Sequence, residues 1–154
     1  MKKLTLVLAL LMFSSPAWGN EGMGSLEYAK LGKKLFSVFE CSHYAISSKN
    51  EMETRRLWEL ALKTGRIFVD AFRAGKITEN DWKKNVPVVW GMLGKGPSTD
   101  FILGKYWQYM SDDIYEKMER DLSAGGCKEC KWDKDLRAMH MVKLFEDSNC
   151  ALIK

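Results

Sequence analysis

The residues of this sequence that are best suited to chemistry are its four cysteines, Cys41, Cys127, Cys130 and Cys150. In an exported chain an even number of cysteines predicts disulfides, and four of them allow three pairings. We favour Cys41 with Cys150 and Cys127 with Cys130. The C-terminal tail would then cross the first helix, and the turn between the last two helices would close on itself. The pairing of Cys41 with Cys127 and of Cys130 with Cys150 stays open.

The stretch 127–130, with the sequence CKEC, also allows a redox interpretation. In thiol oxidoreductases such a pair lies where a helix begins after a strand, because the helix dipole lowers the thiol pKa. Here the motif follows Gly125 and Gly126 between two predicted helices, and no convincing strand precedes it. Lys131 stands where covalent haem attachment needs a histidine. We therefore prefer a structural disulfide and keep thiol redox chemistry at Cys127 and Cys130 as an alternative.

Metal ligands are the next class of chemistry to consider. Cys127, Cys130, His140 and Cys150 are separated by two, nine and nine residues, and only the first interval fits known zinc sites. Met139 and Met141 alternate along a predicted helix, so their sulfurs would point about 200° apart and could not share a copper ion. We expect His140 to be exposed, and we expect neither a metal nor another cofactor.

His43 is the histidine placed where a protected site could form, because it falls on the apolar side of a predicted helix. We expect a polar cluster of Glu40, His43, Arg55 and Arg56 where the first two helices meet. A general base needs a nucleophile or substrate within hydrogen-bond reach. No Ser-His-Asp order, paired carboxylates or glycine-rich phosphate loop accompanies His43. The preferred role is a hydrogen bond that joins the first two helices, and hydrolysis at His43 is an alternative.

The chain is rich in aromatic residues, with six Trp, five Tyr and seven Phe. Most of them fit apolar helical stripes and are expected in the core. Those that fit less well are Trp82, Trp90, Tyr109 and Trp132. Exposed aromatic clusters suit partner surfaces because large rigid rings dominate binding energies. We expect such a surface at Trp82, Trp90, Pro97 and Trp132, with the loop 94–99 at its rim.

Helices must position all of these residues. The stretch 51–75 has the strongest helical pattern, and we expect it to be the central helix on which the others pack. Its apolar and small residues recur every three or four positions: Leu57, Leu60, Ala61, Thr64, Gly65, Phe68, Ala71 and Phe72. Further helices are predicted over 25–47, from Glu79 onward, over 88–93 after Pro87, over 99–122 and over 134–146.

Three glycines lie in the middle of predicted helices, Gly32, Gly65 and Gly104, each before a basic residue. A glycine inside a helix costs about 1 kcal/mol relative to alanine. We expect these positions to mark places where helix backbones approach closely.

The first 19 residues have the pattern of a secretory signal peptide. Lys2 and Lys3 precede an apolar run over 4–13, and the small residues Ala17 and Gly19 stand at the outer positions of the last three residues before the cleavage expected after Gly19. The run is too short for a membrane span, which needs about 20 residues. Removing both lysines would lower the net charge from +4 to +2, which gives little reason to expect nucleic acid binding. Residues 20–154 have the length of one domain.

Together these patterns predict an all-α, single-domain protein, an orthogonal or up-down bundle of about five helices that disulfides stabilise after removal of the signal peptide. We expect a periplasmic or secreted protein without a transmembrane segment. The preferred function is binding to a protein partner outside the cytoplasm, as an inhibitor, immunity or exclusion factor. The alternative is a small periplasmic enzyme that uses Cys127 and Cys130, or His43.

Overall fold

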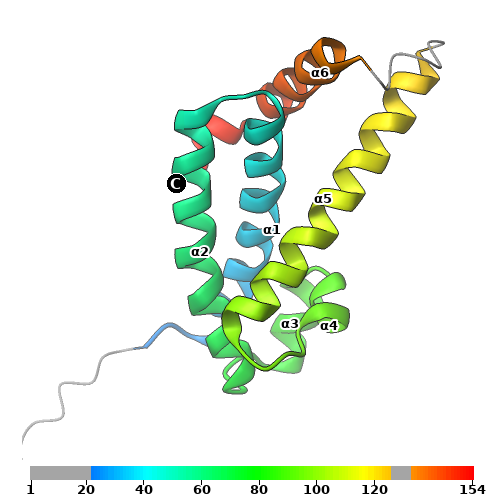
Figure 1. The fold of residues 1–154 in the computed structure, drawn as a ribbon. Coiled ribbons are helices and arrows are strands. Elements are labelled where there is room, and N and C mark those ends of the chain that lie inside the picture. Colours follow the sequence, from blue (N-terminus) through cyan, green and yellow to red (C-terminus); the bar gives the residue numbers. More distant parts are fainter. Residues whose placement is uncertain (1–21, 126–132) are drawn as a thin grey trace, which may run out of the picture.

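The protein is all-helical in the part of the chain that the structure describes. The computed structural model describes residues 22–125 and 133–154, and its regular elements are six α-helices and one 3-10 turn. They are α1 (Ser25–Ser47), α2 (Glu51–Arg73), α3 (Glu79–Asn85), α4 (Val89–Leu93), α5 (Thr99–Ala124), α6 (Lys134–Asp147) and η2 (Cys150–Leu152) (Figure 1). The predicted all-α class is confirmed for these residues. Residues 1–19, the predicted signal peptide, lie outside the described residues.

The helices begin where polar side chains accept backbone hydrogen bonds. Asn50 accepts from the Glu53 amide at 3.2 Å, and Ser98 accepts from the Phe101 amide at 3.1 Å. Thr78 and Asp133 do the same for α3 and α6. Each cap satisfies an amide that the first helical turn leaves unpaired, which fixes the start of the helix. These starts are the predicted ones.

The helix at the centre is α1, so the prediction that the 51–75 helix is central is wrong. α1 contacts α2, α3, α5 and α6, whereas α2 packs mainly along α1 and also meets α5. α1 buries residues on more than one side, among them Leu35, Phe39 and Cys41. A helix that is covered on several sides has a weaker polar face. The clean amphipathic pattern of α2 therefore marks a peripheral helix with one covered face.

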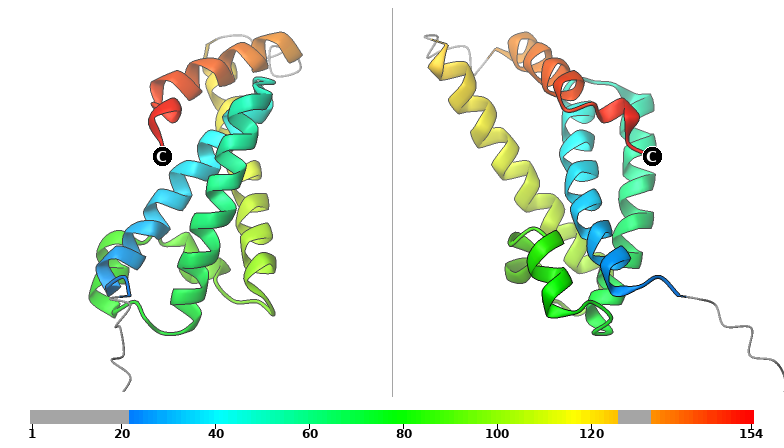
Figure 2. Two further views of the ribbon diagram at one scale, coloured as in Figure 1. Left: turned by 90° about the vertical axis from the view of Figure 1, so that its left-hand side faces the viewer. Right: turned by 180° about the vertical axis from the view of Figure 1, so that it is seen from behind.

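The helices form a splayed arrangement. α1 and α2 run antiparallel side by side, and the first part of α5 packs against them (Figure 1). The second part of α5 leans away, and α6 crosses the end of the molecule to return to α1 (Figure 2). The short helices α3 and α4 lie at the opposite end. None of the helices within 22–125 and 133–154 has the length and hydrophobicity that crossing a bilayer requires.

A series of aromatic contacts connects the helices through the core. Trp90 of α4 stacks on Tyr106 of α5 with ring centroids 3.8 Å apart, and Trp90 also meets Phe68 of α2 at 4.9 Å. Tyr106 in turn lies 5.7 Å from Phe39 of α1. All four side chains are at most 1% exposed. This series positions α5 relative to the α1–α2 pair.

Two of the three helical glycines make room for side chains rather than for backbones. A Cβ atom at Gly32 would lie 2.6 Å from the Phe68 ring, and one at Gly65 would lie 2.6 Å from Leu103. A Cβ atom at Gly104 would meet nothing within 4 Å. The expectation of close backbone approach is therefore wrong in detail, because the space at Gly32 and Gly65 is filled by a ring and a leucine.

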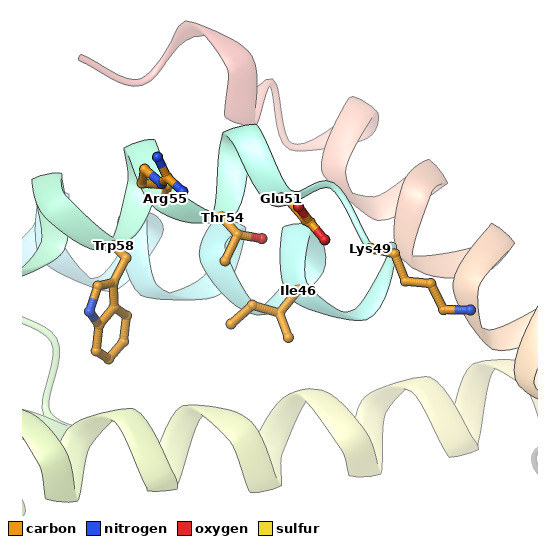
Figure 3. Close-up of a pocket in the computed structure, with 6 residues that line it drawn as sticks. All are labelled: Ile46, Lys49, Glu51, Thr54, Arg55 and Trp58. Carbon is orange, nitrogen blue, oxygen red and sulfur yellow. The ribbon is translucent and has the colours of Figure 1, made fainter.

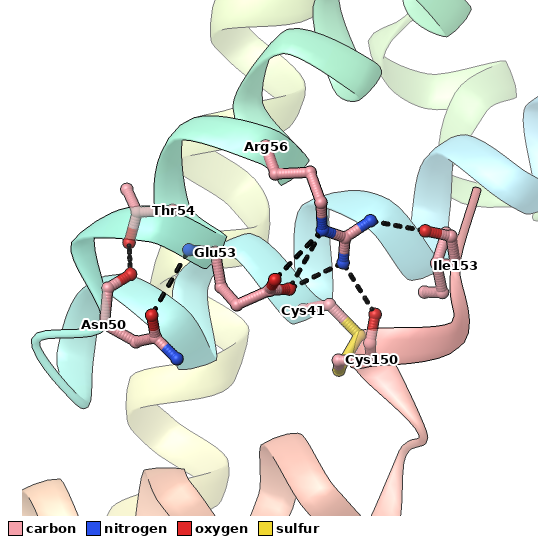
Figure 4. A network of polar contacts seen from close by, with 7 residues as sticks. All are labelled: Cys41, Asn50, Glu53, Thr54, Arg56, Cys150 and Ile153. Carbon is pink, nitrogen blue, oxygen red and sulfur yellow. Dashed lines mark hydrogen bonds and ion pairs between the residues drawn. A yellow bond between two sulfur atoms is a disulfide. The ribbon is translucent and has the colours of Figure 1, made fainter.

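The C-terminal segment is bonded to α1 by the Cys41–Cys150 disulfide, whose Cα atoms are 5.5 Å apart. This is the favoured pairing for Cys41, and it excludes the pairing of Cys41 with Cys127. Cys127 and Cys130 lie outside the described residues. Arg56 of α2 donates hydrogen bonds to the carbonyl oxygens of Cys150 and Ile153 and pairs with Glu53 (Figure 4). A covalent bond and a charged side chain therefore hold the same segment.

Candidate functional site

A cleft of about 590 Å³ opens where α1 turns into α2. Its lining residues are Ile46, Lys49, Glu51, Thr54, Arg55 and Trp58. Ile46 and Trp58 point from α1 and α2 towards α5 (Figure 3). Ile46 is 44% exposed and Trp58 is 37% exposed, so the apolar part of the cleft is open to solvent. Charged side chains stand around this apolar part.

Two smaller clefts continue the first one. One, of about 190 Å³, lies between the end of α1, α5 and α6, and its lining includes Lys49, Tyr115, Met118, Lys134, Arg137 and Met141. The other, of about 150 Å³, lies between α1, α2 and α5, and its lining includes Phe39, Trp58, Leu62, Arg66, Asp100 and Trp107. Lys49 is shared with the first of these and Trp58 with the second. We call the three clefts together the Trp58 groove.

The core holds the Trp58 ring in place. Its centroid lies 4.5 Å from that of Trp107 in an edge-to-face contact and 6.5 Å from that of Phe39. Edge-to-face contacts are a preferred geometry of aromatic pairs. Trp58 therefore offers its uncovered surface to the groove from a fixed position, so little side-chain freedom remains to be lost on binding.

The charge of the Trp58 groove is predominantly positive. Lys49, Arg55, Lys134 and Arg137 line its two solvent-open clefts, against the single acidic residue Glu51. In the part of the chain that the structure describes, none of these four cations forms an ion pair. The guanidinium of Arg137 lies over the ring of Tyr115, 5.1 Å from its centroid. In the third cleft, Arg66 and Asp100 pair with each other at 3.0 Å.

His43 is buried beside the groove but lines none of its three clefts. Its ring stacks on Trp107 with centroids 3.7 Å apart, and its Nε2 atom lies 3.2 Å from the Trp107 carbonyl oxygen. A carbonyl only accepts hydrogen bonds, so Nε2 carries the proton. Burial lowers the pKa of His43 to about 4, because the charged imidazolium loses its water. His43 joins α1 to α5, and the prediction that it joins α1 to α2 is wrong.

The other residues of the predicted polar cluster lie apart. Glu40 accepts a hydrogen bond from the Tyr44 hydroxyl at 2.7 Å, Arg56 holds the C-terminal segment, and Arg55 belongs to the Trp58 groove. Within the described residues, no hydrogen bond or ion pair joins any two of the four predicted members, Glu40, His43, Arg55 and Arg56. Adjacent residues on a helix point about 100° apart, which separates Arg55 from Arg56.

The predicted partner surface is not formed as expected. Trp90 is 1% exposed and belongs to the core, and Trp82 is half-buried against Phe72, with ring centroids 4.6 Å apart. Pro97 is exposed, and its carbonyl accepts a hydrogen bond from Arg73. Trp132 lies outside the described residues. Of the three that the structure describes, Pro97 alone is placed where a partner could reach most of it.

No metal site stands out in the described residues, where no three His, Cys, Asp or Glu side chains come together in a suitable way. His140 is half-buried, with Nε2 3.4 Å from an Asp121 carboxylate oxygen, and is not the exposed residue that the sequence predicted. Met139 is 68% exposed whereas Met141 is 1% exposed, so their side chains diverge on α6.

Of the residues that line the first cleft, Arg55 was a predicted site residue and the others were not. In the sequence, Trp58 lies next to the apolar stripe of α2 and Ile46 lies in the predicted helix over 25–47, and neither was predicted as a site residue. The signal that could have indicated the exposure of Trp58 is its position at the edge of the apolar stripe of α2, three residues after Arg55. Comparison with family models, with curated proteins and with solved structures finds no match to this chain.

Proposed function

We propose that this protein binds a protein partner through the Trp58 groove. The observation that carries the proposal is the pair of half-exposed apolar residues Trp58 and Ile46 in an open cleft with charged sides. Tryptophans backed by a packed core and ringed by polar residues are frequent anchors of protein interfaces. A partner that inserts an apolar side chain beside Trp58 would bury area that is now exposed to water.

The proposed place of action is the periplasm or the medium. The sequence pattern of residues 1–19 supports export, and the bonded sulfurs of Cys41 and Cys150 suit an oxidising compartment. There the protein would act as an inhibitor, immunity or exclusion factor that occupies its partner. Fractionation of the native host by osmotic shock tests this location, and recovery of the chain with the cytoplasmic markers would contradict it.

The enzymatic alternative has less support. His43 stacks on Trp107 and lines none of the three clefts. Its lowered pKa leaves the ring neutral, but the ring is buried away from any cleft. A general base must reach a substrate proton. Cys127 and Cys130 lie outside the described residues, so the structure bears on redox chemistry at these residues in neither direction. Binding through the groove therefore stands as the proposal.

Site-specific photocrosslinking in the native host tests the groove. A photoreactive phenylalanine analogue would replace Thr54 inside the groove or, as a matched control, Val88, which is 84% exposed and precedes α4 at the opposite end of the molecule. We expect a crosslinked product of one defined mass from position 54 only. The product should disappear when Ile46→Glu is added, because a carboxylate opposes apolar contact there. Equal products from both positions, or none from position 54, would overturn the proposal.

A further inference from the structure

We infer that the segment bound in the Trp58 groove is an acidic amphipathic α-helix. The inference rests on the proposed function and adds the chemistry of the partner. Three properties of the groove support it: the sign of its charge, the distribution of its apolar residues and the secondary structure of its walls.

The charge of the groove selects an acidic segment. Lys49 and Arg55 line the same cleft as Trp58, and Lys134 and Arg137 line the cleft at the α6 end, while Glu51 is the only acidic residue lining these two clefts. No ion pair within the described residues neutralises any of the four cations. Carboxylates on the bound segment would supply the missing partners, and such complementary charges favour association and fix orientation.

The apolar residues of the groove occur at two places. Ile46 and Trp58 form one, and Tyr115, Met118 and Met141 form the other at the α5–α6 end. Tyr115 is 44% exposed, whereas the two methionines are buried at the base of their cleft. A segment with two apolar positions on one face would contact both places at once.

The walls of the groove favour a helix over a strand. Within the described residues the groove is bounded by α1, α2, α5 and α6, so its walls use their backbone groups in their own helices. An extended segment would find no free strand edge there, and its buried amides would remain unpaired. A helix satisfies its own backbone and would pack between the α1–α2 pair and the part of α5 that leans away (Figures 1 and 3).

The test uses the whole protein and two displayed libraries of 18-residue peptides. One library carries apolar residues at i, i+3, i+4 and i+7 and varies the remaining positions over Glu, Lys, Gln and Ala. The other is fully random. Each is selected on the native protein after counter-selection on an Ile46→Glu variant whose helix content matches the wild type by circular dichroism. Binders that survive therefore depend on the groove.

We expect the patterned library to yield the binders, enriched in Glu over Lys. Their affinity should fall about tenfold with Arg55→Glu or Lys134→Glu and rise with Glu51→Lys, while Lys33→Glu, at an exposed position on the first half of α1, should leave it unchanged. Added salt should reduce these differences.

Two outcomes would overturn the inference in different ways. Groove-dependent binders that are rich in Lys, or that come from the random library without helical spacing, would reject the acidic helix and leave binding through the groove intact. Failure of both libraries to give any groove-dependent binder would reject the acidic helix, and with photocrosslinking at Thr54 also negative it would reject the proposed function.

Discussion

His43 shows how burial decides the state of a single residue. The imidazole is 6% exposed, stacked on Trp107 and hydrogen-bonded to a backbone carbonyl that accepts the Nε2 proton. Burial lowers its pKa to about 4, so at neutral pH the ring is uncharged. The neutral ring acts as a polar contact between α1 and α5.

This state makes stability depend on pH. Between the ordinary pKa of 6.5 and the folded pKa of about 4, the unfolded chain binds a proton at His43 that the folded chain does not. The free energy of unfolding should therefore fall as the pH drops through this window, by about 3 kcal/mol in total. Urea unfolding at pH 7 and pH 4.5 should show a smaller loss for His43→Gln, which keeps a donor for the carbonyl. Equal losses for both proteins would contradict this account.

Single-residue exposure was the hardest property to predict from the sequence. Trp90 was expected at the surface, yet α4 has only five residues, too few for periodicity to indicate which side is covered. Trp58 was not predicted as a surface residue, and its exposure depends on how much of its ring Trp107 of α5 covers. Both outcomes are set by segments distant in the chain, so no local pattern contains them.

Helix starts were predictable because their causes are local. Asn50, Ser98 and Asp133 each accept a hydrogen bond from an amide two or three residues ahead, and each directly precedes the predicted start of a helix. The packing of the helices was less predictable. The pattern of α2 indicates one buried face, but it cannot show that α1 is covered by more neighbours.

The glycines of α1 and α5 provide a prediction at the scale of helix contacts. Gly32→Ala should lower the free energy of unfolding by about 1 to 3 kcal/mol, because the new Cβ would displace the buried Phe68 ring, which Trp90 already holds at 4.9 Å. Gly104→Ala should raise it by up to about 1 kcal/mol, because that position is open and alanine favours a helix. Urea unfolding of the two variants measures both, and two changes of the same sign would contradict the packing described for Gly32.

In the molecule as a whole, the Cys41–Cys150 disulfide joins the first helix to the C-terminal segment. Its two residues are 109 positions apart, so it restricts the unfolded chain over most of its length. The pairing of Cys41 with Cys150 was favoured because it lets the C-terminal tail cross α1, but the pairing of Cys41 with Cys127 stayed open. Which segment crosses it depended on the return of α6, a property of the complete fold.

Removing the disulfide should lower the free energy of unfolding by about 2 to 5 kcal/mol in a Cys41→Ser, Cys150→Ser double variant. The loss should be greatest at α6, which buries only Met141 among its own residues. When the double variant is compared with the wild type, amide hydrogen exchange should therefore accelerate more in α6 than in α2. An unchanged urea midpoint would show that Arg56 and Met141 suffice to hold the C-terminal segment.

The same bond also closes residues 41–150 into a covalent ring that contains α2 to α6 and the exposed loop at Pro97. If a protease hydrolyses one peptide bond anywhere in that ring, the sulfur bridge still connects both pieces. A nicked molecule would therefore stay whole and keep its helices together until a reductant or a second cut released them.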